Sequence, residues 1–175
     1  MSEIPSHEKQ AIIWDYFKPR HTHAWNMLVL SWRALDAPSE NIEEMMEEEY
    51  YWENFIIRLW LYRITVKTLT QLDHVRSEAE QIISEFDNNF ETNGKNGLKA
   101  IRDMIEHFDD YAAGKGRGPA TREGELDPWR AVSRDRFERG RYVIERAPAY
   151  DAAIRLRSDA KRVSDNFIAW YKASR

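Results

Sequence analysis

The sequence predicts an all-α fold, a helical bundle with a small β-hairpin insertion before the C-terminal helix. The first observation is that no Gly or Pro occurs between Ser39 and Asn93, in a stretch rich in Glu, Leu, Ile and Arg, which favours helix. The second is a helical period near the C-terminus, where apolar residues recur every three or four positions (Leu156, Ala160, Val163, Phe167 and Trp170). The 175 residues include seven Trp, eight Tyr and seven Phe, enough for one core, so we expect a single domain over residues 1–175.

The N-terminal half is expected to be helical throughout. We predict helices over Glu8–Phe17 and His21–Leu35, separated by Pro19, which breaks or bends the chain there because Pro lacks the backbone N–H that a helix interior needs. A long helix is predicted over Ser39–Leu72, with Ser39 as a favourable N-cap, and another over Val75–Phe90.

The C-terminal half contains all seven Gly and more varied structure. Asn93–Gly97 is a strong turn sequence, and a helix is predicted to follow over Leu98–Ala113. Lys115–Pro128 is predicted to be a loop. Alternating apolar residues on either side of Gly140 predict the hairpin, at about residues 129–145, and the last helix is predicted over Asp151–Lys172.

Composition excludes several classes of function. The chain has no Cys, so it cannot form a disulfide, a thiolate metal site, an iron–sulfur centre or a cysteine nucleophile. The most apolar run, Phe55–Tyr62, is interrupted by Arg58 and is far shorter than the roughly 20 residues of a membrane span. The polar Met1–Gln10 segment does not resemble a signal peptide. We therefore expect a cytoplasmic protein with no membrane partner.

Charge is distributed unevenly along the chain, whose net charge is −4. Residues 1–100 carry a net charge of −7, and residues 101–175 carry +3. This asymmetry points weakly to an anionic partner for the basic part. The alternative is that two solvated faces of opposite sign help a homodimer to associate.

The helix predicted over Leu98–Ala113 has one strongly polar face. Arg102 and Glu106 are four residues apart, as are Asp103 and His107, so each pair can interact on a helix surface. Arg102 and His107 lie roughly 140° apart and about 7.5 Å along a continuous helix. They can act together only if Arg102 reaches around the helix, or if a homodimer packs two such helices near its two-fold axis.

The pattern Arg102-Asp103-x-x-x-His107 resembles the R-polar-x(3)-H signature of the HEPN superfamily, helical proteins whose active members are metal-independent endoribonucleases. The resemblance covers the helical layout from about Ser39 to Ala113. The following segment, from Glu106 to Gly116, is similar to that of uncharacterised bacterial HEPN-like proteins. This sequence has Asp103 where toxin members often have Asn, and Asp109 where one branch has Tyr.

The resemblance implies an endoribonuclease or RNA-binding protein of the kind that serves toxin–antitoxin or phage-defence systems. Arg102 would bind phosphate, His107 would act as the acid or base, and Asp103 would orient His107. The partners implied are RNA, a second copy of the chain, and an antitoxin or other partner protein, with no cofactor. The residues expected to bind substrate are Tyr111, Lys115 and Arg117.

A non-catalytic interaction module is the alternative function. In that interpretation the protein is a homodimer and the charged helix face is structural. The carboxylates near His107 (Asp103, Glu106, Asp109 and Asp110) would repel a phosphate. An RNA function therefore needs compensating cations from the following loop or from the hairpin (Lys115, Arg117 and Arg122, or Arg134, Arg136, Arg139 and Arg141).

A metal site is weighed and not favoured. His21 and His23, with His74 or His107, would supply three imidazoles, but residues two apart on a helix face different ways. The acidic run Glu43–Glu49 is expected to be a solvated helix start. Gly114–Pro119 lacks the spacing of a phosphate-binding loop. The Trp residues at 14, 25, 32, 52 and 60 are expected in the core.

Overall fold

The computed structural model describes residues 6–36, 42–92, 94–107 and 132–174. These residues form five α-helices, two short 3-10 helices and two small antiparallel sheets, which confirms the predicted all-α class with a β insertion before the last helix. The α-helices are α1 (Ser6–Ala34), α2 (Ile42–Lys67), α3 (Arg76–Asn88), α4 (Gly97–Glu106) and α7 (Arg146–Ala173). No helix in the described ranges is long and apolar enough to cross a lipid bilayer.

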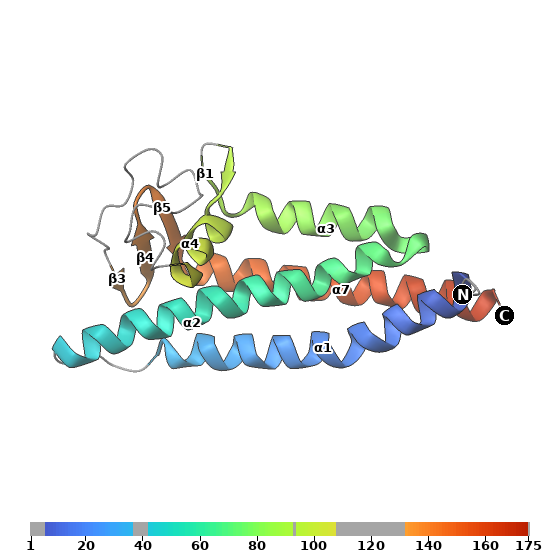
Figure 1. The fold of residues 1–175 in the computed structure, drawn as a ribbon, viewed down its shortest axis with the longest axis horizontal. Helices are drawn as coiled ribbons and strands as arrows, with labels where there is room; N and C mark the ends of the chain where they lie inside the picture. The colour runs from blue at the N-terminus through green and yellow to red at the C-terminus, as the bar shows by residue number, and fades with distance from the viewer. Residues whose placement is uncertain (1–5, 37–41, 93, 108–131, 175) are drawn as a thin grey trace.

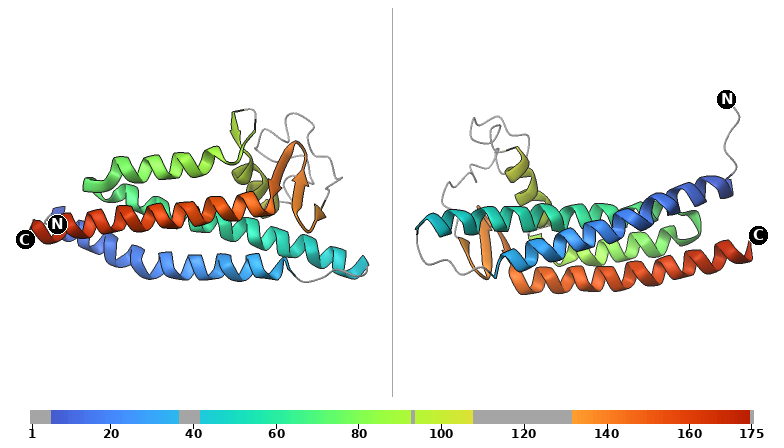
Figure 2. Two further views of the ribbon diagram at one scale, coloured as in Figure 1. Left: turned by 180° about the vertical axis from the view of Figure 1, so that it is seen from behind. Right: turned by 90° about the horizontal axis from the view of Figure 1, so that it is seen from below.

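The long helices lie along one axis (Figure 1). α1 and α2 form a pair, α7 runs behind α2, and α3 lies on the side of α7 away from α1, an order that the opposite view repeats (Figure 2). α4 and the three-stranded sheet are gathered at one end of the bundle. The start of α1 and the end of α7 lie at the other end.

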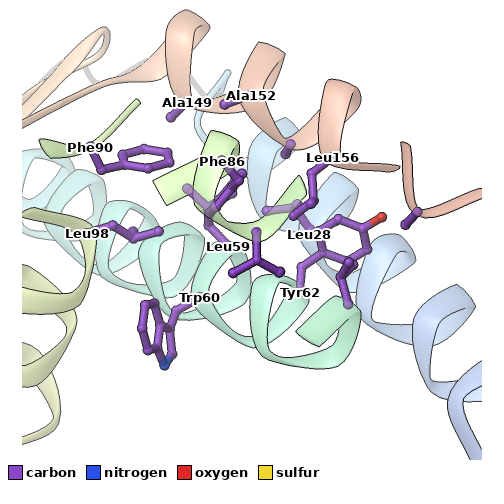
Figure 3. Packing of buried hydrophobic residues seen from close by; sticks show 14 of the residues in the cluster. Leu28, Leu59, Trp60, Tyr62, Phe86, Phe90, Leu98, Ala149, Ala152 and Leu156 are labelled. Atoms are coloured by element: carbon purple, nitrogen blue, oxygen red, sulfur yellow. The ribbon is translucent and has the colours of Figure 1, made fainter. Parts of the chain in front are cut away.

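The core runs between these helices (Figure 3). α2 is its centre, since its residues 52, 55, 56, 59, 62 and 66 are all fully buried. Apart from the adjacent pair 55 and 56, these residues recur every three or four positions, the period of a helix that buries one face. Trp52 also fixes the sheet, because its Nε1–H donates to the Ser133 carbonyl at 2.8 Å.

Pro19 bends one helix, the second of the two outcomes expected there, and does not divide the segment into two helices. α1 continues through Pro19, and Figure 1 shows a bend near its middle. Pro removes one helical hydrogen bond and crowds the preceding turn, which bends a helix rather than ending it when packing holds both sides. Here Phe17 and Trp25, on either side of Pro19, are both buried in the core.

The end of α2 also differs from the prediction. The α-helix stops at Lys67 rather than Leu72, and the chain continues as η1 (Thr68–Gln71) and η2 (Asp73–Val75). Buried Gln10 of α1 fixes this connection, because its amide oxygen accepts from the Asp73 backbone N–H at 2.9 Å. Its amide nitrogen donates to the Asp73 carboxylate at 3.1 Å. A contact 63 residues away in the sequence therefore decides where α3 begins.

The predicted hairpin is confirmed and has a third strand. β3 (Val132–Ser133), β4 (Arg136–Arg139) and β5 (Tyr142–Glu145) form one antiparallel sheet in that order. Inward and outward residues alternate along β4 and β5, as a half-buried sheet requires. α7 begins at Arg146 instead of Asp151, because the Arg146 N–H is bound by the Asp135 carbonyl at 2.8 Å, directly after β5.

α4 is shorter than predicted. A small hairpin of β1 (Glu91–Thr92) and β2 (Lys95–Asn96) precedes it, with Gly94 at a φ of 74° in the turn. The Asn96 side chain caps α4 by accepting from the Lys99 N–H at 2.9 Å. The helix ends at Glu106, and His107 has non-helical backbone angles (φ −121°, ψ 35°). The prediction of a helix to Ala113 is wrong at this point, and residues 108–113 lie outside the described ranges.

Candidate functional site

The polar face of α4 points outward because the opposite face of the helix is buried. Leu98, Ile101 and Met104 are buried, at intervals of three residues. This places Lys99, Arg102, Asp103 and Glu106 on the outer side of the helix. The face lies at the end of the bundle that also holds the sheet (Figure 1).

Arg102 lies over the indole ring of Trp60 on α2. Its guanidinium carbon is 4.9 Å from the ring centre, and its side chain is only 17% exposed. The Nε atom is buried and has no hydrogen-bond acceptor among the described residues. Nη1 pairs with Glu106, and it also lies 3.1 Å from the Asp103 carboxylate. The predicted pair of Arg102 and Glu106 is therefore present.

A second arginine uses the same ring. Arg63 is also 4.9 Å from the Trp60 ring centre, and its Nε donates to the Asp87 carboxylate of α3 at 3.0 Å. Figure 3 shows Trp60 at the margin of the core, beside Leu98 of α4. Two guanidinium groups on one indole connect α2, α3 and α4. We call this set the Trp60 cluster (Trp60, Arg63, Asp87, Arg102, Asp103 and Glu106).

Asp103 is not bound to the His107 side chain. Its carboxylate accepts from Lys99 Nζ at 2.5 Å and lies beside Arg102. Asp103 meets His107 through the backbone, because its carbonyl accepts from the His107 N–H at 3.1 Å. The orientation of His107 by the Asp103 carboxylate, expected from the sequence, is not present in this arrangement.

His107 caps the C-terminal end of α4 and its side chain is exposed. A helix C-terminus carries partial negative charge and favours a nearby cation such as protonated His. His107 thus stands at the open end of the polar face, while Arg102 is set deeper, on Trp60. The predicted substrate-binding residues Tyr111, Lys115 and Arg117 lie outside the described ranges, as does Arg122.

The hairpin arginines are engaged by nearby acids or rings. Arg134 pairs with Asp36 at 3.3 Å, and Arg136 pairs with Glu138. Arg139 is buried with Glu49 and Glu53 at 3.7 and 3.5 Å. Arg141 lies over the Tyr142 ring at 5.4 Å. These guanidinium groups, expected as compensating cations for RNA, are therefore already engaged within the chain.

Two of the four histidines weighed as metal ligands, His21 and His74, contact aromatic side chains, whereas His23 and His107 are exposed. His21 Nε2 is 2.9 Å from the Tyr62 hydroxyl. Burial, and secondarily the charge of Arg157, lowers the pKa of His21 to about 4, while burial raises the pKa of Tyr62. His74 stacks on Trp170 at 4.9 Å. Among the residues described, no group of three His, Cys, Asp or Glu side chains could hold a metal ion.

Trp60, Arg63 and Asp87 are the members of the cluster that the sequence analysis did not identify as functional residues. Trp60 was expected only as core, which its 8% exposure supports. The signal in the sequence was the spacing of three residues between Trp60 and Arg63, which brings two side chains together on one helix face. The contact of Arg102 with Trp60 joins positions 42 residues apart and depends on how α4 docks on α2.

Comparison of the chain with models of known protein families, with curated proteins and with solved structures gave no match. We therefore infer function from the geometry of α4 and the Trp60 cluster.

Proposed function

We propose that the protein is a HEPN-like, metal-independent endoribonuclease whose active residues are Arg102 and His107. The observation that carries this proposal is the placement of Arg102 on Trp60, with Nη1 directed to half-exposed Glu106, five residues before an exposed His107. An arginine held against an aromatic ring loses little freedom when it binds a phosphate, and its planar fork matches phosphate oxygens.

The carboxylate partners of Arg102 do not prevent phosphate binding. Glu106 is 38% exposed and lies one helical turn from Arg102. Solvent-exposed ion pairs at this spacing contribute only about 0.3–0.5 kcal/mol, and here the carboxylate is the more exposed partner. A phosphate that accepts two hydrogen bonds from the Arg102 guanidinium can displace Glu106, while the contact with Trp60 keeps the guanidinium in place.

The proposed reaction is internal transesterification of RNA. The 2′-hydroxyl oxygen bonds to phosphorus, and the bond from phosphorus to the 5′-oxygen breaks. A base takes the 2′-hydroxyl proton, and an acid gives a proton to the departing 5′-oxygen. The products are a 2′,3′-cyclic phosphate and a 5′-hydroxyl. His107 can perform either proton transfer, because imidazole titrates near neutrality, and Arg102 stabilises the negative charge on the non-bridging oxygens of the pentacoordinate phosphorus.

We propose further that two copies complete the site. One chain offers a single imidazole at the end of α4, whereas the reaction needs both a base and an acid. A homodimer that packs the two α4 helices near its two-fold axis supplies His107 twice, together with two copies of Arg102.

RNA cleavage in the presence of EDTA tests the proposal. A 5′-labelled RNA should be cut to cyclic-phosphate ends, and His107→Ala should lower the rate by about 10²–10⁴-fold. Arg102→Ala should do likewise, and His7→Ala, another exposed histidine, should leave the rate unchanged. Equal background cleavage by wild type and His107→Ala, or complete loss of cleavage in EDTA, would refute the proposed metal-independent endoribonuclease activity.

The second candidate is a non-catalytic homodimeric interaction module. It is favoured by the pairing of Arg102 within its own chain and by the contact of Asp103 with Lys99 rather than with the His107 side chain. In that case Trp60→Ala and Arg102→Ala each lower the free energy of unfolding, and no substitution of His107 affects any activity of the protein.

A further inference from the structure

A groove of about 380 Å³ lies between α1 and α2, remote in sequence from the polar face of α4. Ala24, Met27 and Leu61 supply its apolar surface, and Arg20, His23, Arg58 and Thr65 also line it. α7 packs on the other side of this helix pair, where Trp14 meets Phe167 and Arg157 lies over Trp25. None of the described helices covers the groove (Figures 1 and 2).

The apolar surface continues beyond the groove in a line. On α1, Ile12, Tyr16 and Leu30 are each more than half exposed, and at 100° per residue they share one face with Arg20, His23 and Met27. On α2, Tyr50, Leu61 and Ile64 are exposed at 66%, 42% and 40%. From Ile12 to Leu30 this line spans about 27 Å along the helix, far longer than a small molecule.

Beside the groove itself, the charge has one sign. Although residues 1–100 carry a net charge of −7, neither Tyr16–Leu35 nor Asn54–Leu72 contains any Asp or Glu. Arg20 lies over the Tyr16 ring at 3.6 Å, and Arg58 Nε donates to Asn54 at 3.3 Å. No carboxylate in the described part of the chain lies within ion-pair distance of either arginine.

A second copy of the chain does not fit this charge pattern. Pairing about a two-fold axis at the groove would bring the patch that holds Arg20 and Arg58 against the same positively charged patch of the other copy, because both copies use the same surface. Like charges placed together in an interface oppose association. The complement of this face is therefore a different surface, with apolar residues in a line and acidic residues beside them.

We propose that the α1–α2 groove binds an amphipathic helix of a partner protein, with acidic residues flanking its apolar stripe. A groove between two antiparallel helices is the surface on which a third helix packs by ridges and grooves. Leu, Met or Phe side chains of the partner would bury Met27 and Leu61. Its Glu or Asp side chains would pair with Arg20 and Arg58. This inference does not depend on catalysis at α4.

Selection from a helix library tests the proposal with the full chain. The library displays helices of about 18 residues with a fixed apolar stripe, and with Glu, Lys, Gln or Ser varied at the flanking positions. Helices that bind should be enriched in Glu at the flanks. The selected helix should bind the double variant Arg20→Glu/Arg58→Glu about tenfold or more weakly, and Leu61→Asp likewise.

Two controls separate the groove from general effects. Lys18→Glu makes the charge change of one of these two substitutions on the opposite side of α1, where Lys18 is exposed, and should keep full affinity. His107→Ala should also keep full affinity, even if it removes RNA cleavage. Far-ultraviolet circular dichroism checks that each variant is folded.

Several results would overturn the proposal. The first is that the selected helices are enriched in Lys at the flanking positions, or are not enriched in any residue there. The second is that neither groove variant weakens binding of the selected helix. The third is that the library yields no helix that binds. A change in the oligomeric state of the chain alone on Leu61→Asp would assign the face to a second copy. Loss of RNA binding or of anionic-vesicle binding on Arg20→Glu/Arg58→Glu would assign it to those ligands.

Discussion

His21 is kept neutral inside the bundle by burial and by the nearby charge of Arg157, which together lower its pKa to about 4. In the unfolded chain an imidazole takes up its proton near pH 6.5. Between these two values the unfolded state binds more protons than the folded state. The stability that depends on neutral His21 is therefore complete above pH 6.5 and is lost as the pH falls toward 4.

We predict that His21→Gln makes the free energy of unfolding less dependent on pH. Gln remains neutral and can still hydrogen-bond the Tyr62 hydroxyl. The slope between pH 6.5 and 5, measured by urea unfolding, should decrease by up to about 1.4 kcal/mol per pH unit. His23→Gln, at an exposed neighbour, should retain the wild-type slope. Equal slopes in wild type and His21→Gln would contradict the assignment.

Gly97 is required by close packing. A Cβ at this position would lie 3.0 Å from the Phe90 carbonyl oxygen and 3.3 Å from the Tyr142 ring. That oxygen cannot retreat easily, because it accepts from the Gly97 N–H at 2.7 Å. Gly97→Ala should lower the free energy of unfolding by about 1–3 kcal/mol in urea titrations.

Gly94 provides the contrast, because a Cβ there meets nothing within 4 Å but the φ angle is +74°. Gly94→Ala should lower the free energy of unfolding by about 1 kcal/mol, and Gly94→Asn should recover part of that loss because Asn tolerates this conformation. If Gly97→Ala is as stable as wild type, the close contact at the start of α4 is wrong.

At single positions, the sequence predicted one of two side-chain pairs that lie one helical turn apart. It did not predict the contacts that depend on packing between helices. The pair of Arg102 and Glu106 follows from spacing alone. The sharing of Trp60 by Arg63 and Arg102 does not, because it requires the docking of α4 on α2. Asp103 was predicted to contact His107, but Lys99, one turn in the other direction, holds the carboxylate.

At the scale of elements, Arg146 joins the start of α7 to the end of α1. Its side chain is 7% exposed and lies over the Trp32 ring at 4.3 Å. It donates to the Trp32 carbonyl at 3.3 Å and to Asp36 at 2.6 Å. The hydrogen bond from Arg146 is the main cause that lowers the pKa of Asp36.

Arg146→Ala should therefore lower the free energy of unfolding by about 1–3 kcal/mol, because it removes a buried hydrogen-bonding group and its packing. The pKa of Asp36, followed by NMR, should rise toward its ordinary value. Arg155→Ala, on the exposed side of α7, should change the free energy of unfolding by less than about 0.5 kcal/mol. An unchanged pKa of Asp36 would rule out the contact.

Element boundaries show where local signals give way to tertiary contacts. The turn at Gly94 and the hairpin at Gly140 were predictable, because Gly marks positions where a turn needs a positive φ angle. The two glycines adopt φ angles of 74° and 59°. The end of α2 depends on Gln10, and the start of α7 depends on Asp135. Gln10 is distant in sequence and Asp135 lies in the turn between β3 and β4, so helical periodicity could not locate the ends.

For the whole molecule, the fold class followed from the distribution of Gly and Pro, but the assembly does not follow from one chain. The proposed homodimer can be tested cleanly because the chain has no Cys. Glu106→Cys should form a covalent dimer under mild oxidation if the α4 helices meet at a two-fold axis. Asp165→Cys, exposed on α7, should remain monomeric on non-reducing gels. The reverse pattern would place the interface elsewhere.

The start of α1 and the end of α7 emerge at the same pole of the bundle, opposite α4 and the sheet (Figure 1). A fluorophore, affinity handle or surface tether attached beside the start of α1 or the end of α7 would therefore sit at the pole opposite α4. Surface-captured protein should present its α4 pole outward to added polynucleotide, whichever of the two positions is used for capture.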